Sequence, residues 1–316
     1  MVCHNCCIEM VKAGFYGRNK VQRFKCKQCR RRFAEPQQRP FGEDVRLPKE
    51  TVALILNCLV EGNSVRSTGR LCGVEKRTVL NILKLAGEAS ERLLTEKVRN
   101  VPVKDLEMDE VWSYVGCKQG HLKPHHAGRQ FGDAYTFIAL ERTSKLVVAW
   151  HLGKRDRINT EDFISKVRIA TAPGYFEIST DAFAPYENAI DAGLSDRASH
   201  SNVVKLFSHH VEEGRERYSP GSFVCVQKDA VSGNPDLDRA STSHVERKNG
   251  TLRQWCKRLT RLTYAFSKKW DNLKAALALH FAHYNFCRVH GSLRITPAMA
   301  AGITERVWGI EDLILV

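Results

Sequence analysis

The spacing of apolar and polar residues first indicates helices. In PKETVALILNCLVEG, apolar residues recur at helical intervals up to Gly62. The next segment, SVRSTGRLCGVEKRTVLNILKLAG, predicts a short helix with Ser64 at its N-cap, a turn at Gly73 and a second helix over 75–86. Two short helices joined by a glycine turn are typical of a helix-turn-helix, although an ordinary helical hairpin has the same pattern. In a helix-turn-helix the second helix enters the major groove, and its exposed candidates for DNA contact are Glu75, Lys76, Arg77 and Asn81.

From residue 105 the pattern shortens to that of strands. DLEMDEVWSYVG, AYTFIALERT and KLVVAWHLGKR predict three strands, TEDFISKVRIA a helix, YFEISTDAF a fourth strand, and residues 185–192 a further helix. This order predicts an α/β fold, a mixed sheet flanked by helices. Residues 213–240 lack such a pattern, and we expect an insertion or long loop there.

Charge adds a partner to this picture. Lysine and arginine number 49 against 35 acidic residues, a net charge of +14, which favours a polyanionic partner and nucleic acid first. A basic scaffold protein is the alternative. No apolar run approaches the roughly 18 to 20 residues of a membrane span, and the first residues lack the order of a signal peptide. We therefore expect no membrane partner and a soluble, cytoplasmic protein associated with the bacterial nucleoid.

Four of the 11 cysteines lie in metal-ligand spacing near the N-terminus. Cys3, Cys6, Cys26 and Cys29 form a C-x2-C…C-x2-C pattern, which is typical of a structural Zn²⁺ site and favours zinc over disulfides. Residues 1–40 are therefore predicted to form a small zinc-dependent module. The neighbouring His4 and Cys7 break the symmetric spacing and are not included.

Three acidic residues lie where a free carboxylate is unexpected. Asp109 lies within the first predicted strand, Asp181 ends the fourth, and Glu246 begins the basic segment SHVERKNGTLRQWCKRLTRLT. Carboxylates converging from two strands and a helix would suit Mg²⁺ or Mn²⁺. Each also has a plain structural alternative: a strand-end turn, a helix cap and a first-turn carboxylate respectively, with Glu110 as an ion-pairing neighbour of Asp109.

The basic segment follows Glu246 directly. If the whole segment is one helix, Gly250, Arg253 and Lys257 share a face with Glu246, and this track of cations is expected to hold a DNA backbone beside the metal ions.

The sequence resembles the transposases of the insertion sequence 1 family. The run SHVERKNGTLRQWCKRLTRLTYAFSKKWDNL followed by HFAHYNFCRVH matches that family's ER-x-N-x-x-LR, F-S-K and H-Y-N elements, with Arg247, Asn249 and Arg253 in the first of them. The resemblance implies a zinc ribbon at 1–40, a helix-turn-helix at 47–90 and an RNase H-like DDE catalytic domain at 101–316 with an insertion near 213–240. It also assigns catalysis and Mg²⁺ or Mn²⁺ binding to Asp109, Asp181 and Glu246.

This resemblance implies a transposase that acts on double-stranded DNA as a homo-oligomer, by metal-dependent hydrolysis and strand transfer. A catalytically inactive DNA-binding regulator and a nuclease without strand transfer are the alternatives. The tail YNFCRVHGSLRITPAMAAGI resembles an ending shared by several such families. Its Tyr284, Asn285, His290 and Pro297 are open to either a structural or a DNA-contact role.

Overall fold

The structure is a computed structural model, and it describes residues 1–16, 21–35, 40–41, 45–208 and 222–314. The chain divides into two compact units, Met1–Pro48 and Lys49–Val316. Each unit is described by itself.

The smaller unit is a three-stranded antiparallel sheet, and few of its described residues are buried apolar side chains. Its core cluster consists of the fully buried Cys3 and Cys26 and the nearly buried Met10, with Phe24 and Phe33 packed against them. The strands, in the order β1-β2-β3, are β1 (Val11–Tyr16), β2 (Val21–Lys25) and β3 (Arg32–Ala34). So small a core makes this unit depend on whatever links its cysteines.

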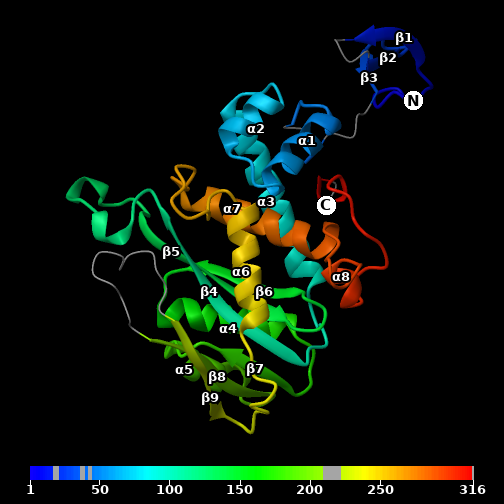
Figure 1. Cartoon of the computed structure of the whole chain (residues 1–316). Coiled ribbons are helices and arrows are strands. Elements are labelled where there is room, and N and C mark those ends of the chain that lie inside the picture. The colour runs from blue at the N-terminus through cyan, green and yellow to red at the C-terminus, as the bar shows by residue number, and fades with distance from the viewer. Residues whose placement is uncertain (17–20, 36–39, 42–44, 209–221, 315–316) are drawn as a thin grey trace. The chain divides into compact units, whose positions relative to one another are not determined.

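The larger unit is built on a six-stranded mixed sheet in the order β6-β5-β4-β7-β8-β9 (Figure 1). The central strand β4 pairs antiparallel with β5 and parallel with β7, and residues on both of its faces are buried. The strands are β4 (Asp105–Val115), β5 (Gly132–Glu141), β6 (Val147–Gly153), β7 (Phe176–Thr180), β8 (Ala198–Ser208) and β9 (Ser222–Ser232). The predicted mixed α/β fold is thus confirmed.

The segment predicted as an insertion or loop contains a strand. Residues 213–221 lie outside the described residues, but Ser222–Ser232 forms β9, which pairs antiparallel with β8 at the edge of the sheet. Most of its side chains are exposed, so the strand lacks the apolar alternation of a half-buried strand. That exposure is the physical reason why the pattern did not indicate it.

Helices cover both faces of the sheet. Helix α6 crosses in front of β4, while α4 and α5 lie together behind the sheet (Figure 1). The helices that follow β4 in the chain are α4 (Arg157–Ala170), α5 (Pro185–Leu194), α6 (Ser243–Trp255), α7 (Trp270–Ala282) and α8 (Pro297–Ala300). Helix α7 continues into a π-helical turn at His283–Cys287. Short 3₁₀ turns lie at Gln119–His121, Pro124–His126 and Asp312–Ile314.

Three helices precede the sheet: α1 (Lys49–Val60), α2 (Val65–Leu71) and α3 (Lys76–Lys97). The predicted N-cap is confirmed, because the Ser64 hydroxyl accepts a hydrogen bond from Ser67 N, and Gly73 takes the left-handed conformation in the turn. Helix α3 is longer than the predicted 75–86, because its later turns pack against α7. At Gly87 a Cβ would come within 2.4 Å of the Ala275 Cα, so glycine permits this close packing.

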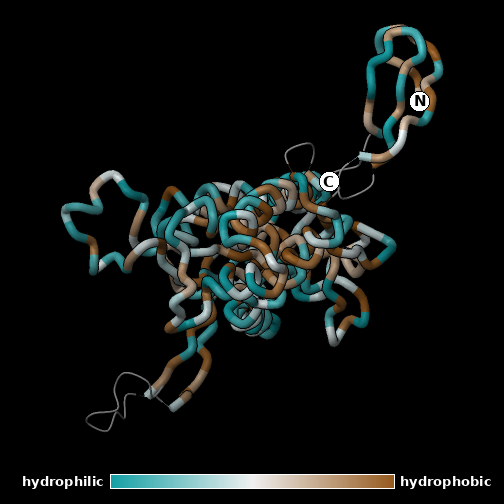
Figure 2. Tube along the Cα trace, turned by 90° about the horizontal axis from the view of Figure 1, so that it is seen from above, coloured by the Kyte–Doolittle hydropathy of each residue, from teal (hydrophilic) through white to brown (hydrophobic). Residues whose placement is uncertain are grey.

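Apolar residues gather in the interior of the larger unit, and polar residues cover its periphery (Figure 2). Among the described residues, no helix combines the length and the apolar character that crossing a membrane requires.

Candidate active site and cysteine cluster

The four predicted cysteine ligands converge in the smaller unit. One sulfur atom from each of Cys3, Cys6, Cys26 and Cys29 lies within 4.8 Å of the others. Both C-x2-C segments fold alike: Cys7 N donates to Cys3 O, Arg30 N donates to Cys26 O, and the residue after each second cysteine has a positive φ. Two equivalent turns thus present two pairs of thiols to one point.

The donor set fits a tetrahedral zinc ion. The backbone N–H groups of Cys29 and Gln28 lower the pKa of Cys26 to about 7, so that the thiolate that a metal needs is favoured there. Burial and the surrounding thiols raise the pKa of Cys6 to about 12. These four cysteines can hold Zn²⁺, and the ion would replace the thiol protons.

In the larger unit, strand register brings Asp109 and Asp181 together. Strands β4 and β7 run parallel with Asp105 opposite Glu177 and Glu107 opposite Ser179. The same register continued by two residues places Asp181, just after β7, beside Asp109 in the middle of β4. One oxygen each of Asp109, Glu110 and Asp181 lies within 4.8 Å of the others, an oxygen cluster that can bind a divalent cation.

Glu110, the sequence neighbour of Asp109, belongs to this cluster although it was set aside as an ion-pairing residue. Its side chain is only 3% exposed, and its Oε2 accepts from Arg155 Nε at 3.3 Å. Arg155 Nη2 also reaches Asp181 Oδ2 at 3.3 Å, and its guanidinium lies 4.0 Å from the Phe183 ring centroid. Arg155 therefore bridges two carboxylates where a metal ion would otherwise balance their charge.

Glu246 lies in the first turn of α6 and lines the same hollow as Asp109 and Glu110. Its Oε1 accepts from Thr242 Oγ1 at 2.7 Å, and its Oε2 pairs with Lys205. We use "carboxylate site" for Asp109, Glu110, Asp181 and Glu246. In this arrangement Glu246 is held at the edge of the cluster rather than within it.

The charges in the carboxylate site repel one another. Burial, with a contribution from the Asp181 and Glu246 charges, raises the pKa of Asp109 to about 6. Burial and the Asp181 charge likewise raise the pKa of Glu110 to about 7, against the opposing effects of the Tyr186 hydroxyl and Arg155. A bound cation would relieve this cost, so the site's electrostatics suit a metal ion.

A fully buried acid, Glu107, fixes the start of α6. Its Oε2 accepts from the backbone N–H groups of His244 at 2.7 Å and Val245 at 3.0 Å, and its Oε1 accepts from Arg142 Nε at 3.0 Å. A carboxylate at a helix N-terminus accepts hydrogen bonds from the free N–H groups and interacts favourably with the helix dipole. Since α6 carries Glu246, Glu107 couples the position of that acid to β4.

The residues of the predicted basic track have different environments. Asn249 donates to Asp109 Oδ2 at 2.7 Å and so faces the carboxylate site rather than solvent. Arg253 is half-buried and donates to Leu259 O and Trp112 O, while Arg247 is exposed.

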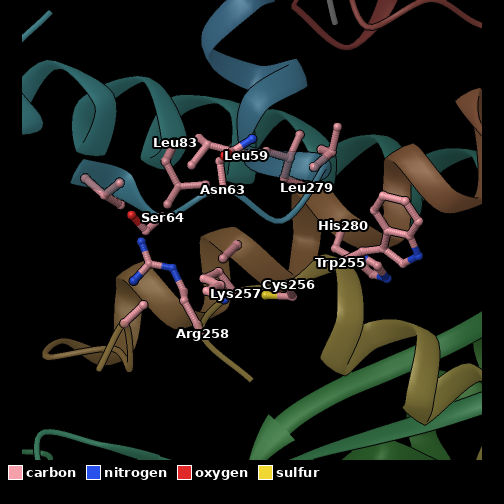
Figure 3. Close-up of a pocket in the computed structure, with 14 residues that line it drawn as sticks. Leu59, Asn63, Ser64, Leu83, Trp255, Cys256, Lys257, Arg258, Leu279 and His280 are labelled. Atoms are coloured by element: carbon pink, nitrogen blue, oxygen red, sulfur yellow. The ribbon is translucent and has the colours of Figure 1, made fainter. Parts of the chain in front are cut away.

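The prediction that Lys257 shares the helical face of Glu246 is wrong, because α6 ends at Trp255. The chain leaves the helix at Cys256, whose backbone is extended. Lys257 follows, next to Arg258, at a small cavity whose other walls come from α1, α3 and α7 (Figure 3).

The helix-turn-helix candidates are solvent-facing. Glu75, at the N-cap position of α3, and Lys76, Arg77 and Asn81 within that helix are all exposed. A DNA-contact role for them remains a prediction.

In the C-terminal tail, Asn285 has a structural role. It is fully buried and bonds to both the N–H and the C=O of Val147 in β6.

Three residues in and around the carboxylate site were not predicted as part of it: Glu107, Glu110 and Arg155. The segment LEMDEV holds three acids in four positions of a buried strand, a signal that could have identified Glu107 and Glu110. No comparable signal distinguishes Arg155, whose role depends on the turn after β6.

No family model and no curated protein matches the chain. Among solved structures, it is similar to a piggyBac transposase in a synaptic complex with hairpin DNA, at 10% identity and a TM-score of 0.39, covering 88% of this chain and 71% of that one. It is also similar to the Mos1 transposase in a paired-end complex with the left transposon end, at 11% identity and a TM-score of 0.19, covering 51% of this chain and 60% of that one.

Proposed function

We propose that this protein is a DNA transposase of the DDE class with an RNase H-like catalytic domain, similar to the insertion sequence 1 family. It binds the ends of its own element, hydrolyses a phosphodiester bond there, and joins the freed 3′-hydroxyl to target DNA. Hydrolysis and joining are the same in-line displacement with different nucleophiles, so one site serves both.

The observation that carries the proposal is the convergence of acids from three separate elements. Asp109 lies mid-strand in β4, Asp181 directly follows the adjacent parallel strand, and Glu246 begins a helix that crosses the same face. Acids at such positions oppose stability unless a cation binds them, which favours a functional role. A regulator without catalytic activity would have no need for them.

Mg²⁺ or Mn²⁺ would be held by Asp109 and Asp181, with Glu246 completing the set after release from Lys205. Such ions activate the attacking hydroxyl and stabilise the leaving oxygen. The protein's own part is positional: Asn249 orients Asp109, Glu107 anchors α6, and Arg155 compensates the charge of Glu110 and Asp181.

DNA recognition is assigned to the other parts of the chain. The zinc ribbon and the exposed start of α3, with Lys76, Arg77 and Asn81, would find the element's ends. Arg247 and Arg253, with Lys257 beyond the helix, would contact the strand near the carboxylate site. A homo-oligomer would bring two ends together.

The test is cleavage and joining of labelled DNA that carries the sequences flanking the gene in its source genome, with Mg²⁺ or Mn²⁺. Asp109→Asn and Glu246→Gln should each reduce joined product on the order of 10³-fold. The matched controls Asp191→Asn and Glu305→Gln change exposed acids and should keep full activity. Cleavage without joining would identify a nuclease, and binding without either reaction would identify a regulator.

A further inference from the structure

Two sides of helix α6 line hollows of opposite charge, one acidic and one basic. Residues Glu246, Asn249, Gly250 and Arg253 line the hollow of the carboxylate site. Other residues of α6, among them Arg247, Lys248 and Trp255, line a second hollow of about 790 Å³ on the other side of the helix. We use "basic pocket" for this hollow, which is lined by the basic side chains of Lys145, Arg247, Lys248, Arg288, His244 and His290.

Cations outnumber acids at the basic pocket. None of the residues that line it, all within the described part of the chain, is an aspartate or glutamate. Two acids lie close behind the lining: Glu107 bonds to His244 Nδ1 at 2.8 Å and is itself occupied by Arg142 and the start of α6, and Glu107 and Glu141 both act on the charge of Lys145. Several cations around one hollow repel one another, and an anion in the hollow would offset that cost.

Lys248 shows that the pocket is built rather than incidental. It is only 3% exposed, its Nζ lies 3.0 Å from His280 Nε2, and it stands 3.3 Å from the Tyr284 ring centroid. A buried lysine without an acidic partner is costly, and aromatic and imidazole neighbours offset only part of the cost. The π-helical turn after α7 presents Tyr284 and ends at Cys287, directly before Arg288, and such turns are frequent at functional sites.

The pocket also offers flat surfaces. The Arg288 guanidinium lies 3.8 Å from the Trp255 ring centroid, which leaves a stacked cation and aromatic pair at the wall. Guanidinium planes and aromatic rings are the surfaces on which unpaired bases stack. Cations combined with such surfaces favour a nucleotide of a single strand over a free inorganic anion.

The basic pocket and the hollow of the carboxylate site lie on two sides of α6 and share one lining residue, Gln254. We infer that the basic pocket binds a backbone phosphate of single-stranded DNA next to the bond that the carboxylate site cleaves. This inference rests on the proposed function for its location but concerns binding alone. The strand would pass over the C-terminal part of α6, with its phosphate against Arg288 and Arg247 and an adjacent base on the Arg288 and Trp255 planes.

The experiment measures binding of a fluorescein-labelled eight-nucleotide single strand to the full, zinc-loaded chain without added Mg²⁺ or Mn²⁺, so that no cleavage occurs, over a series of salt concentrations. Arg288→Gln should weaken binding about tenfold and reduce the salt dependence by about 0.7 in the slope of log affinity against log salt. Arg288→Lys should restore the slope, because it keeps the charge. The matched control is Arg306→Gln, an arginine that also lies over a tryptophan ring but does not line the pocket.

Arg247→Gln gives a second variant that removes the charge of an exposed side chain lining the pocket, and it should also lose about tenfold in affinity. Circular dichroism confirms folding for each variant. Wild-type affinity and slope in both Arg288→Gln and Arg247→Gln would overturn the inference. Inorganic phosphate as competitor separates the two sources of phosphate: if it binds more tightly than the oligonucleotide, the assignment to DNA is overturned.

The two proposals fail in different ways. A chain that joins DNA while Arg288→Gln binds normally overturns only the pocket. A chain with no chemistry on any DNA, but with Arg288-dependent binding, overturns the transposase and leaves the pocket in place.

Discussion

The chain contains two metal-ligand clusters that arise from the sequence in different ways. The four cysteines lie in two local turns whose geometry is fixed within four residues each, and their sulfur atoms form much of the core of a unit that has little else. The carboxylates come from β4, from the end of β7 and from α6, on a sheet with a large core of its own. The cysteine cluster stabilises the unit that contains it, whereas the carboxylates are positioned by a fold that is stable without them and that they destabilise.

The largest expected effect of this difference is on metal removal. Chelation of zinc should unfold the Met1–Pro48 unit, because a structural zinc site contributes on the order of 10 kcal/mol. The larger unit should keep its stability. All five tryptophans lie between Trp112 and Trp308, so tryptophan fluorescence reports on the larger unit alone, and a colorimetric zinc indicator reports on the smaller one.

The same experiment has an internal control. Cys26→Ser should abolish zinc binding, while Cys7→Ser, beside the cluster but outside it, should retain it. If chelation also abolished the unfolding transition that tryptophan fluorescence reports for the larger unit, the stability of the two units would be coupled. That result would contradict the proposed difference between the two clusters.

The next largest effect is expected at Glu107, the acid through which the larger unit builds its site. Glu107→Gln should reduce the free energy of unfolding by about 3 kcal/mol, because it removes a buried charge that satisfies Arg142 and the start of α6. Urea unfolding followed by tryptophan fluorescence measures this. The control Glu161→Gln breaks a half-exposed pair with Arg157 and should change stability by less than about 0.5 kcal/mol.

At Glu110 we expect the corresponding substitution to raise the free energy of unfolding rather than to lower it. Its pKa is about 7 in the fold against an ordinary 4.5, so the folded protein is stabilised below pH 4.5 relative to higher pH, and this stabilisation is lost as the pH rises through 7. Glu110→Gln does not ionise. At pH 8 without metal it should be more stable than the native chain by up to about 3 kcal/mol, and at pH 4 the difference should disappear.

Urea unfolding at the two pH values in EDTA provides the measurement, with exposed Glu88→Gln as the control. Addition of Mg²⁺ at pH 8 should stabilise the native chain and narrow the gap. A variant less stable than the native chain at pH 8 would show that Glu110 supports the fold through Arg155 instead of opposing it.

The contrast between the clusters also explains what the sequence could predict. The cysteine ligands are identifiable from spacing alone, because each pair lies within one turn. Asp109 and Asp181 were identifiable because a carboxylate is unusual in an apolar strand. Their proximity depends on the parallel register of β4 and β7, which no local pattern encodes.

Side-chain partners were the least predictable part of the site. Asn249, a predicted DNA contact, bonds to Asp109, and Glu246 pairs with Lys205 from β8, a strand that the sequence analysis left unassigned. Edge strand β9 and the end of α6 at Trp255 escaped for a related reason: exposure and a change of backbone conformation leave no apolar period to detect.

The smallest expected effect concerns the pair between Lys205 and Glu246, which is where the carboxylate site differs most from a closed metal cage. Both side chains are at least one-third exposed, at 34% and 41%, so Lys205→Met should change stability by less than about 1 kcal/mol. If Lys205 competes with the metal for Glu246, its removal should lower the Mg²⁺ concentration for half-maximal cleavage by less than about fivefold. The control Lys166→Met changes a lysine outside the site and should leave the half-maximal Mg²⁺ concentration unchanged. A higher Mg²⁺ requirement in Lys205→Met would mean that Lys205 holds Glu246 in place for the metal, and the cluster would then be more nearly preformed, like the cysteines.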